Sequence, residues 1–182
     1  FLQAAELGLL EPYRPTYIND LQAWSVRQYA MTQNMVGGFY AGAIGIGWNT
    51  ELLKKKKLPE PKCWADLLDP RLKGEVQVAD PNSAGTAYNA LATIVQLMGE
   101  EKGFDYLKKL HRNISQYTKS GIAPVKAVAL GETGVAIAFL HDLVTQRLAG
   151  APIKTVAPCE GTGYETGAVS LVKGSKAPEA AR

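Results

Sequence analysis

Residues 75–99 read EVQVADPNSAGTAYNALATIVQLMG, and this stretch decides the fold that we expect. It opens with a short apolar run, residues 75–80, which is typical of a buried strand. Residues 84–99 predict a helix that ends at Gly99, because their apolar residues recur at helical spacing. Tyr88, Leu91, Ala92, Val95 and Met98 fall on one face of this helix.

The rest of the chain continues this alternation of strands and helices. Strands are predicted at residues 114–118, 133–140, 153–158 and 164–174, and helices at residues 100–113, 123–132 and 141–150. Residues 36–50, VGGFYAGAIGIGWNT, predict one or two buried strands with a glycine-rich bend, and residues 63–74 predict a helix that stops before Pro70. The pattern predicts an open α/β sheet with parallel pairs and flanking helices.

The composition is that of an ordinary globular protein. The 182 residues are 46% hydrophobic and 20% charged, with a formal net charge of +3. No arginine-rich stripe with interleaved aromatic residues argues for nucleic acid, and no apolar run approaches the roughly 18 residues that span a bilayer. Both ends interrupt helical patterns, at residues 1–8 and 176–182, so we expect the sequence to be part of a longer protein.

The two cysteines, Cys63 and Cys159, are expected to be separate thiols, although an oxidising compartment would permit a disulfide between them. They do not form a CxxC pair, and the sequence contains only two histidines, which argues against a zinc site. We predict no metal site and no cofactor.

The junction between the strand at 75–80 and the helix at 84–99 is a candidate anion site. The first turn of a helix has unpaired N–H groups and the positive end of the helix dipole. Ser83 and Thr86 add hydroxyl groups, and Gly85 lets a ligand approach the backbone. The alternative is that Asn82 or Ser83 only caps the helix.

A second junction repeats this arrangement. The strand at 114–118 is followed by Lys119, Ser120 and Gly121, and a helix starts at Pro124, where proline is well tolerated. In open α/β sheets ligands bind at the carboxyl ends of strands, so two helix N-termini there can face one anion. Neither junction matches a nucleotide-binding fingerprint.

Two carboxylates are further candidates for ligand binding. Asp142 follows the strand at 133–140, where it meets a ligand amine or simply occupies the first turn of a helix. Glu165 lies in the glycine-rich stretch CEGTGYETGAV, residues 159–169, and either meets a cationic ligand group or forms a surface salt bridge. No nucleophile and base are arranged for catalysis, and we predict that the protein is not an enzyme.

Four stretches carry a resemblance to a known family: FLQAAELGLLEPY (1–13), CWADLLDPRLKGEVQVADPNSAGTAY (63–88), YTKSGIAPVKAVALGETGVAIAF (117–139) and GAVSLVKGSKAPEAAR (167–182). Together they resemble the extracellular solute-binding proteins of ABC importers. The chain is most similar to the branch that holds ferric-iron-binding and 2-aminoethylphosphonate-binding proteins.

The resemblance implies a periplasmic or membrane-tethered receptor with the type II periplasmic-binding fold, which delivers a small solute to ABC permease subunits. It implies two α/β lobes joined by two crossover strands, with the solute between them. Residues 46–160 would form a complete C-terminal lobe. Residues 1–45 and 161–182 would form part of the N-terminal lobe with the crossover strands.

The resemblance also implies a set of ligand-binding residues, which we predict as Asn82, Ser83, Ala84, Gly85, Thr86, Ser120, Gly121, Asp142, Glu165, Tyr40 and Tyr164. Ferric-binding members carry a tyrosine pair where this chain has Leu140, His141 and Asp142, which argues against tight ferric binding. A zwitterion such as 2-aminoethylphosphonate fits, with its phosphonate on the helix N-termini and its ammonium on a carboxylate. A receptor for ferric iron or another metal with an anion is the alternative.

Overall fold

The computed structural model describes residues 1–177 and 179. It contains two compact units, one formed by Phe1–Ala41 with Thr166–Arg182 and the other by Gly42–Glu165. The helix expected at 176–182 falls on positions outside the described residues, apart from its first residues and Glu179.

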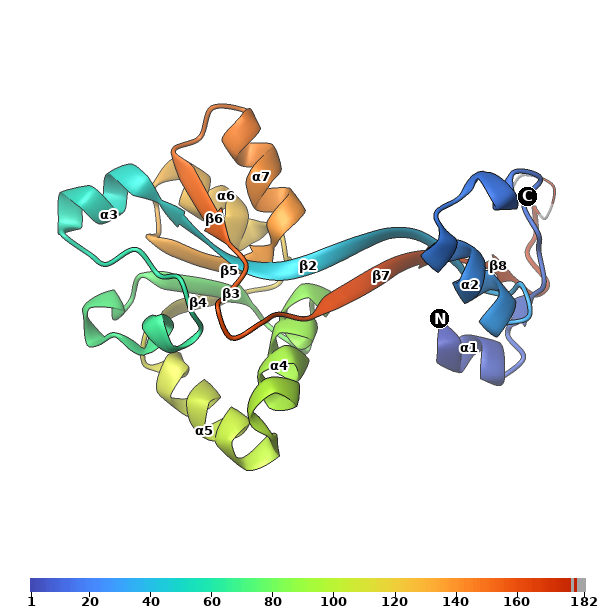
Figure 1. Cartoon of the computed structure of the whole chain (residues 1–182), viewed down its shortest axis with the longest axis horizontal. Helices are drawn as coiled ribbons and strands as arrows, with labels where there is room; N and C mark the ends of the chain where they lie inside the picture. Colours follow the sequence, from blue (N-terminus) through green and yellow to red (C-terminus); the bar gives the residue numbers. More distant parts are fainter. Residues whose placement is uncertain (178, 180–182) are drawn as a thin grey trace. The chain divides into compact units, whose positions relative to one another are not determined.

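The larger unit is built on an open sheet in the order β4-β3-β5-β2-β6, with β7 also paired to β2 (Figure 1). Its strands are β3 (Val76–Ala79), β4 (Ile114–Thr118), β5 (Val135–Phe139) and β6 (Ile153–Val156), with the later part of β2 (Gly37–Asn49) and the start of β7 (Tyr164–Val169). β3 runs parallel to both β4 and β5, whereas β2 runs antiparallel to both β5 and β6. The expected α/β sheet is therefore present, with its parallel pairs centred on β3.

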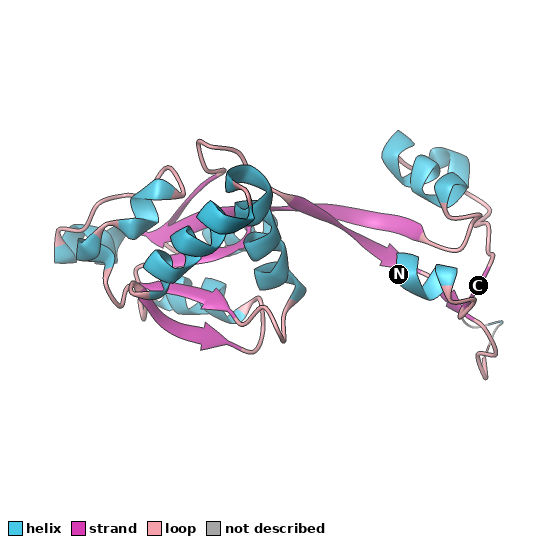
Figure 2. Ribbon diagram, turned by 90° about the horizontal axis from the view of Figure 1, so that it is seen from below, coloured by secondary structure: helices cyan, strands magenta, loops and turns pink. Residues whose placement is uncertain are grey.

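Helices cover both faces of this sheet (Figure 2). They are α3 (Thr50–Lys56), α4 (Gly85–Met98), α5 (Glu100–His111), α6 (Ala123–Leu130) and α7 (Leu140–Leu148). One hydrophobic cluster joins α4 and α5 to one face of the sheet, and a second cluster joins α6 and α7 to the other face.

β5 shows how the sequence divides these two clusters. Its residues Val135, Ile137 and Phe139 belong to the cluster under α4 and α5, whereas Ala136 and Ala138 belong to the cluster under α6 and α7. This is the period-two alternation of a strand that is buried on both faces.

β2 follows the same alternation with glycine. Ile44, Ile46 and Trp48 are buried in the cluster under α4 and α5. A Cβ atom on Gly47 would lie only 2.4 Å from Cδ2 of Leu143, which is close enough to clash. A Cβ atom on Gly45 would clash in the same way with the side chain of Leu140. The glycines of the GAIGIG stretch therefore let α7 pack closely on the sheet.

The apolar face that the sequence predicts for α4 is not the most deeply buried face of this helix. The buried residues are Ala87, Ala90, Thr93 and Ile94, and Tyr88 is 64% exposed. Small residues let the helix approach the sheet, so the alanines face inward although the larger apolar residues form a neighbouring stripe. Part of that stripe packs between helices, because a Cβ on Gly103 of α5 would lie 3.0 Å from the Cα of Val95.

The helix that the sequence predicts before Pro70 is a short 3-10 turn instead of an α-helix. The segment forms two short 3-10 turns, η2 (Ala65–Leu68) and η3 (Pro70–Leu72). Asp69 separates them in an extended conformation and caps the second turn by accepting a hydrogen bond from the Arg71 amide at 2.9 Å. The residue before a proline is driven out of the α region, which explains why the first turn stops before Pro70, as the sequence predicts.

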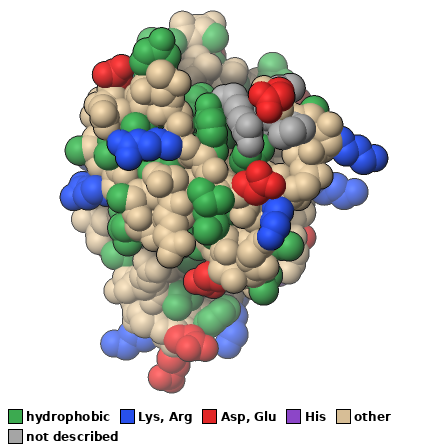
Figure 3. Space-filling view, turned by 90° about the vertical axis from the view of Figure 1, so that its right-hand side faces the viewer, with side chains coloured by type: hydrophobic (Ala, Val, Ile, Leu, Met, Phe, Trp, Pro, Cys, Tyr) green, Lys and Arg blue, Asp and Glu red, His purple; other side chains and the backbone are tan. Residues whose placement is uncertain are grey.

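The smaller unit contains α1 (Leu2–Glu6), η1 (Ile18–Asp20), α2 (Ala23–Met31) and the antiparallel pair of β1 (Leu10–Glu11) with β8 (Leu171–Val172). α1 ends before Gly8, which has a φ of +68°, as a helix stop does. Apolar side chains reach the surface of this unit (Figure 3), namely Phe1, Leu2, Leu7, Leu9, Tyr17, Met31 and Phe39. Its own buried core is correspondingly small.

Among the described residues, none of the helices combines the length and the apolar character that crossing a bilayer requires.

Cys63 and Cys159 form a disulfide, so the expectation of two separate thiols is wrong. The Cys159 amide donates to the Lys62 carbonyl at 3.1 Å, which brings the two backbone segments alongside each other. The cysteines are 96 positions apart in the sequence, and only the tertiary contact reveals the pairing.

We predict that the double variant Cys63→Ala/Cys159→Ala has a free energy of unfolding about 3 to 5 kcal/mol lower than the native protein, because the bond closes a long loop in the unfolded chain. Urea denaturation of both proteins measures the difference. A loss below about 1 kcal/mol would contradict this role of the disulfide.

Candidate functional site

The carboxyl ends of three strands meet at one edge of the larger unit's sheet. β4, β3 and β5 are neighbours and mutually parallel, so the loops that follow them leave from the same edge. These connections are the loop after β3 (residues 80–84), the loop after β4 (residues 119–122) and the first turn of α7. In open α/β sheets this edge is where ligands bind.

Asp80 organises the loop after β3. Its Oδ1 accepts hydrogen bonds from the Asn82 amide at 2.8 Å and from Asn82 Nδ2 at 3.0 Å. Its carbonyl accepts from the amides of Ser83 and Ala84 at 3.0 and 2.9 Å. This is a turn in which an aspartate side chain replaces backbone partners, and it fixes where α4 begins.

The N-terminus of α4 has no side-chain cap. Its N-cap residue is Ala84, with extended backbone, so the alternative in which Asn82 or Ser83 caps the helix is not met. Within residues 1–177, the amides of Gly85 and Thr86 have no hydrogen-bond partner. Two donors at the positive end of a helix dipole are therefore available to an anion.

The loop after β4 presents a similar arrangement. Thr118 Oγ1 donates to the Ser120 carbonyl at 2.9 Å, and the Ala123 amide donates to the same carbonyl at 3.2 Å. α6 begins directly after Ile122, with Pro124 in its first turn. In the described part of the chain, the amides of Ser120 and Gly121 are without a hydrogen-bond partner.

The structure brings these two loops into contact. Ser83 Oγ lies 3.0 Å from the Lys119 carbonyl and 3.3 Å from the Asp80 carbonyl, so this hydroxyl ties the loops together. A Cβ on Gly121 would overlap Thr86 Oγ1 and would lie 2.9 Å from Thr86 Cβ. The glycine is required here for a close approach of the backbone to the first turn of α4. We call Gly85, Thr86, Ser120 and Gly121 the amide pair site.

Glu165 lies beside this site. Its Oε2 is 3.6 Å from the position that a Cβ on Gly85 would occupy. The carboxylate has no ion-pair partner among the described residues. The surface salt bridge considered for Glu165 is therefore not present in this part of the chain.

Asp142 lies in the first turn of α7, at the same edge of the sheet. Its Oδ1 is 3.6 Å from His141 Nε2, and the His141 ring stacks on Phe139 with centroids 5.1 Å apart. His141 also packs over Gly42, where a Cβ would lie 2.8 Å from its Cε1. The predicted ligand-binding residues include Asp142 but not the adjacent His141.

A hollow of about 430 Å³ adjoins Glu165 between α4 and the segment that leads into β7. It is lined by Tyr88, Asn89, Thr93, Tyr164 and Glu165, among others. Tyr88 and Asn89 are not among the predicted ligand-binding residues. Tyr164 is 73% exposed beside the hollow. Tyr40 belongs to the other unit, where it packs against Gly167, and its part in a site stays a prediction.

An apolar cavity of about 200 Å³ lies elsewhere in the larger unit, between the sheet and helices α4 and α5. Its lining includes Trp64, Ile94 and Leu107. It offers little to recognise a polar solute, which needs placed donors and acceptors, so the loop edge is the better candidate site.

The fold and this edge together define an α/β domain in which two neighbouring helix N-termini carry open backbone amides. Comparison with known proteins agrees. The sequence profile of the bacterial extracellular solute-binding protein family matches residues 1–182, and the chain belongs to this family.

Individual relatives are similar over almost the whole chain. An uncharacterized protein of Haemophilus influenzae is 56% identical over 176 residues, which are 96% of this chain and 51% of that protein. The periplasmic binding protein AfuA from Actinobacillus pleuropneumoniae, solved with exogenous fructose-6-phosphate bound, is 50% identical, with a TM-score of 0.89 over 99% of this chain and 57% of its own. The periplasmic binding protein P5PA is 39% identical, with a TM-score of 0.90 and the same coverage.

These likenesses confirm the expected type II periplasmic-binding fold. The chain spans about half the length of the relatives it matches.

We predict that Gly121→Ala lowers the free energy of unfolding by about 1 to 3 kcal/mol, because the added methyl group overlaps Thr86. Gly85→Ala is the matched control, since a Cβ there meets only Glu165 at 3.6 Å, and its effect should lie between no change and a gain of about 1 kcal/mol. Urea denaturation compares the two variants. Equal stability of both would mean that the two loops are not in close contact.

Proposed function

We propose that the protein is the solute-binding receptor of an ABC importer, and that it captures a small phosphorylated solute without chemical turnover. The observation that carries this proposal is the amide pair site, in which two loops with open backbone donors meet at one edge of the sheet. The chain is 50% identical to AfuA, whose structure holds fructose-6-phosphate. A sugar phosphate is therefore the first candidate solute.

In this proposal the phosphate is bound by the amides of Gly85, Thr86, Ser120 and Gly121, with the Thr86 hydroxyl as a further donor. Backbone donors at a helix N-terminus suit a phosphate because the helix dipole favours negative charge. Asn82 and Ser83 then have a different part from the one expected, since their side chains hold the loops in place. Ala84 is the N-cap residue of α4, and its extended backbone leads the chain into the first turn, where the open amides lie.

Asp142 and Glu165 recognise the remainder of the solute. Two carboxylates near an anion site would repel a simple anion, so they favour a solute that carries donors close to its phosphate. The hydroxyl groups of a sugar phosphate are such donors, and so is the ammonium of 2-aminoethylphosphonate. The two carboxylates therefore keep 2-aminoethylphosphonate as a second candidate solute. Ferric iron with a bound anion is a further possible outcome of the calorimetric titration below.

The division of the chain supports a two-lobe receptor. We propose that Gly42–Glu165 is one complete lobe, close to the expected 46–160, and that the remaining residues belong to the other lobe. β2 and β7 would be the two crossover strands. The receptor would work in the periplasm, or tethered at the outer face of the membrane, and would deliver its solute to permease subunits.

Calorimetric titration of the full-length protein tests the function. We expect heat with fructose-6-phosphate and weaker heat with inorganic phosphate. Strong binding of 2-aminoethylphosphonate in place of the sugar phosphate would change the solute but keep the phosphate site. Binding of ferric citrate alone would contradict the proposal.

Thr86→Val removes one donor while keeping the shape of the side chain. We expect its affinity for fructose-6-phosphate to fall about tenfold, the equivalent of one hydrogen bond to a charged group. Thr155→Val in β6 is the control and should bind normally. Equal affinity of the two variants would remove Thr86 from the site.

Asp142→Asn separates the two candidate solutes. Asparagine keeps an acceptor for a sugar hydroxyl but loses the charge that pairs with an ammonium, so we expect a loss of about tenfold for fructose-6-phosphate and a larger loss for 2-aminoethylphosphonate. Inorganic phosphate should bind as before. A similar loss for all three ligands would argue against the assigned role, and Asp105→Asn on α5 serves as the control.

A further inference from the structure

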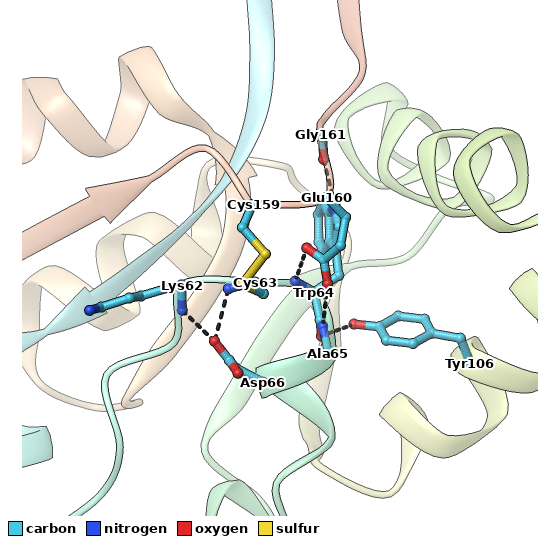
Figure 4. The surroundings of a disulfide bond; sticks show 9 residues. All are labelled: Lys62, Cys63, Trp64, Ala65, Asp66, Tyr106, Cys159, Glu160 and Gly161. Carbon is cyan, nitrogen blue, oxygen red and sulfur yellow. Dashed lines mark hydrogen bonds between the residues drawn. A yellow bond between two sulfur atoms is a disulfide. The ribbon is translucent and has the colours of Figure 1, made fainter.

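We propose that Glu160 and the Cys63–Cys159 disulfide form a positioning device that holds Glu165 beside the amide pair site. We call the contacting segments, residues 62–66 and 159–161, the clasp (Figure 4). The inference rests on the proposed role of Glu165 in solute binding. All residues of the clasp, and Glu165 itself, belong to the larger unit.

The clasp has a covalent part and a backbone part. The disulfide joins the two segments, and the Cys159 amide donates to the Lys62 carbonyl at 3.1 Å. Asp66 closes the first segment on itself, because its Oδ2 accepts from the amides of Lys62 and Cys63 at 2.8 and 2.9 Å. The partner of Cys159 is therefore held in a defined backbone conformation.

Glu160 adds a bidentate contact. Its Oε2 accepts from the Trp64 amide at 2.8 Å and its Oε1 accepts from the Ala65 amide at 2.9 Å. Both N–H groups lie at the start of η2, where they have no partner within the turn. A charged acceptor on two backbone donors is stronger than a neutral pair. Glu160 is exposed, yet both of its carboxylate oxygens bind backbone amides of the neighbouring segment, so its side chain holds the two segments together.

Trp64 anchors the clasp in the core. It is 0% exposed, and its Nε1 donates to the Gly161 carbonyl at 3.0 Å. Its own carbonyl accepts from Tyr106 Oη at 2.6 Å. Burial, and then the charges of Glu160 and Asp66, raise the pKa of Tyr106 above its usual range, so the hydroxyl stays a donor.

The chain between the clasp and Glu165 is fixed at successive points. Gly161 turns with a φ of +107°, a conformation that glycine adopts without strain. Thr162 Oγ1 then donates to the Ile44 carbonyl at 2.6 Å, and the Ile44 amide donates to the Gly163 carbonyl at 3.0 Å. Glu165 follows, with its carboxylate next to Gly85. Little freedom is left between Glu160 and the ligand-binding carboxylate.

If Glu160 only stabilises the fold, its substitution has a different effect from the one expected if it positions Glu165. Loss of fold stability alone lowers the unfolding temperature and leaves solute affinity unchanged while the protein is folded. Loss of positioning weakens only the part of the affinity that depends on Glu165. The two effects are separated by a double-mutant cycle.

The experiment uses the full-length protein with Glu160→Gln, Glu165→Gln, the double variant and Glu101→Gln on α5 as a matched exposed control. Glutamine can accept only one of the two N–H bonds. We expect Glu160→Gln to weaken fructose-6-phosphate binding at least about fivefold, because a carboxylate misplaced by a fraction of an ångström binds poorly. Inorganic phosphate affinity should not change, and in the Glu165→Gln background the effect of Glu160→Gln should disappear.

Hydrogen exchange provides a readout that needs no solute. We expect Glu160→Gln, and independently Cys63→Ala/Cys159→Ala, to speed exchange of the Ile44 amide and of residues 161–165, with α7 unchanged. Unchanged exchange of these amides would overturn the inference. So would a fructose-6-phosphate affinity of Glu160→Gln within twofold of that of the Glu101→Gln control. An equal loss of affinity from Glu160→Gln in the native protein and in the Glu165→Gln variant would also overturn it. If the native protein binds no phosphorylated solute, the proposed function fails, and the exchange result alone decides whether the clasp fixes this segment.

Discussion

The arrangement of the site depends on the contact between two loops at the carboxyl ends of β3 and β4. Ser83 and Gly121 produce it, one by a hydrogen bond to the Lys119 carbonyl and the other by the absence of a side chain beside Thr86. The contact brings two helix N-termini together, and each keeps open amides among the described residues. A shared anion would satisfy donors that neither loop satisfies by itself.

Much of the fold follows from the sequence because the alternation in the strands is strict. β5 places large apolar residues on one face and alanines on the other, which fits helices on both sides of the sheet. The orientation of α4 does not follow, because alanines and larger residues form neighbouring stripes, and the sheet selects the smaller ones for close approach. The disulfide was missed since its cysteines meet only through tertiary structure.

The sequence predicted that the two loops lie at one sheet edge but not their internal contacts, and the anion site itself stays a prediction. The small residues after β3 and β4 indicated an anion site, since both precede helices at one sheet edge. The sequence does not reveal that Asp80, rather than Asn82 or Ser83, controls the turn, because several polar residues there are able to form it. The link from Glu160 to Trp64 joins segments distant in sequence and has no local signature.

In the receptor that we propose, one anion binds the open amides of both loops together. Amide chemical shifts in the full-length protein, followed by NMR during titration with fructose-6-phosphate, test this most directly. We expect the resonances of the Gly85, Thr86, Ser120 and Gly121 amides to shift along one binding curve. Binding that leaves these four resonances unchanged, or that moves only one of the two loops, would contradict it.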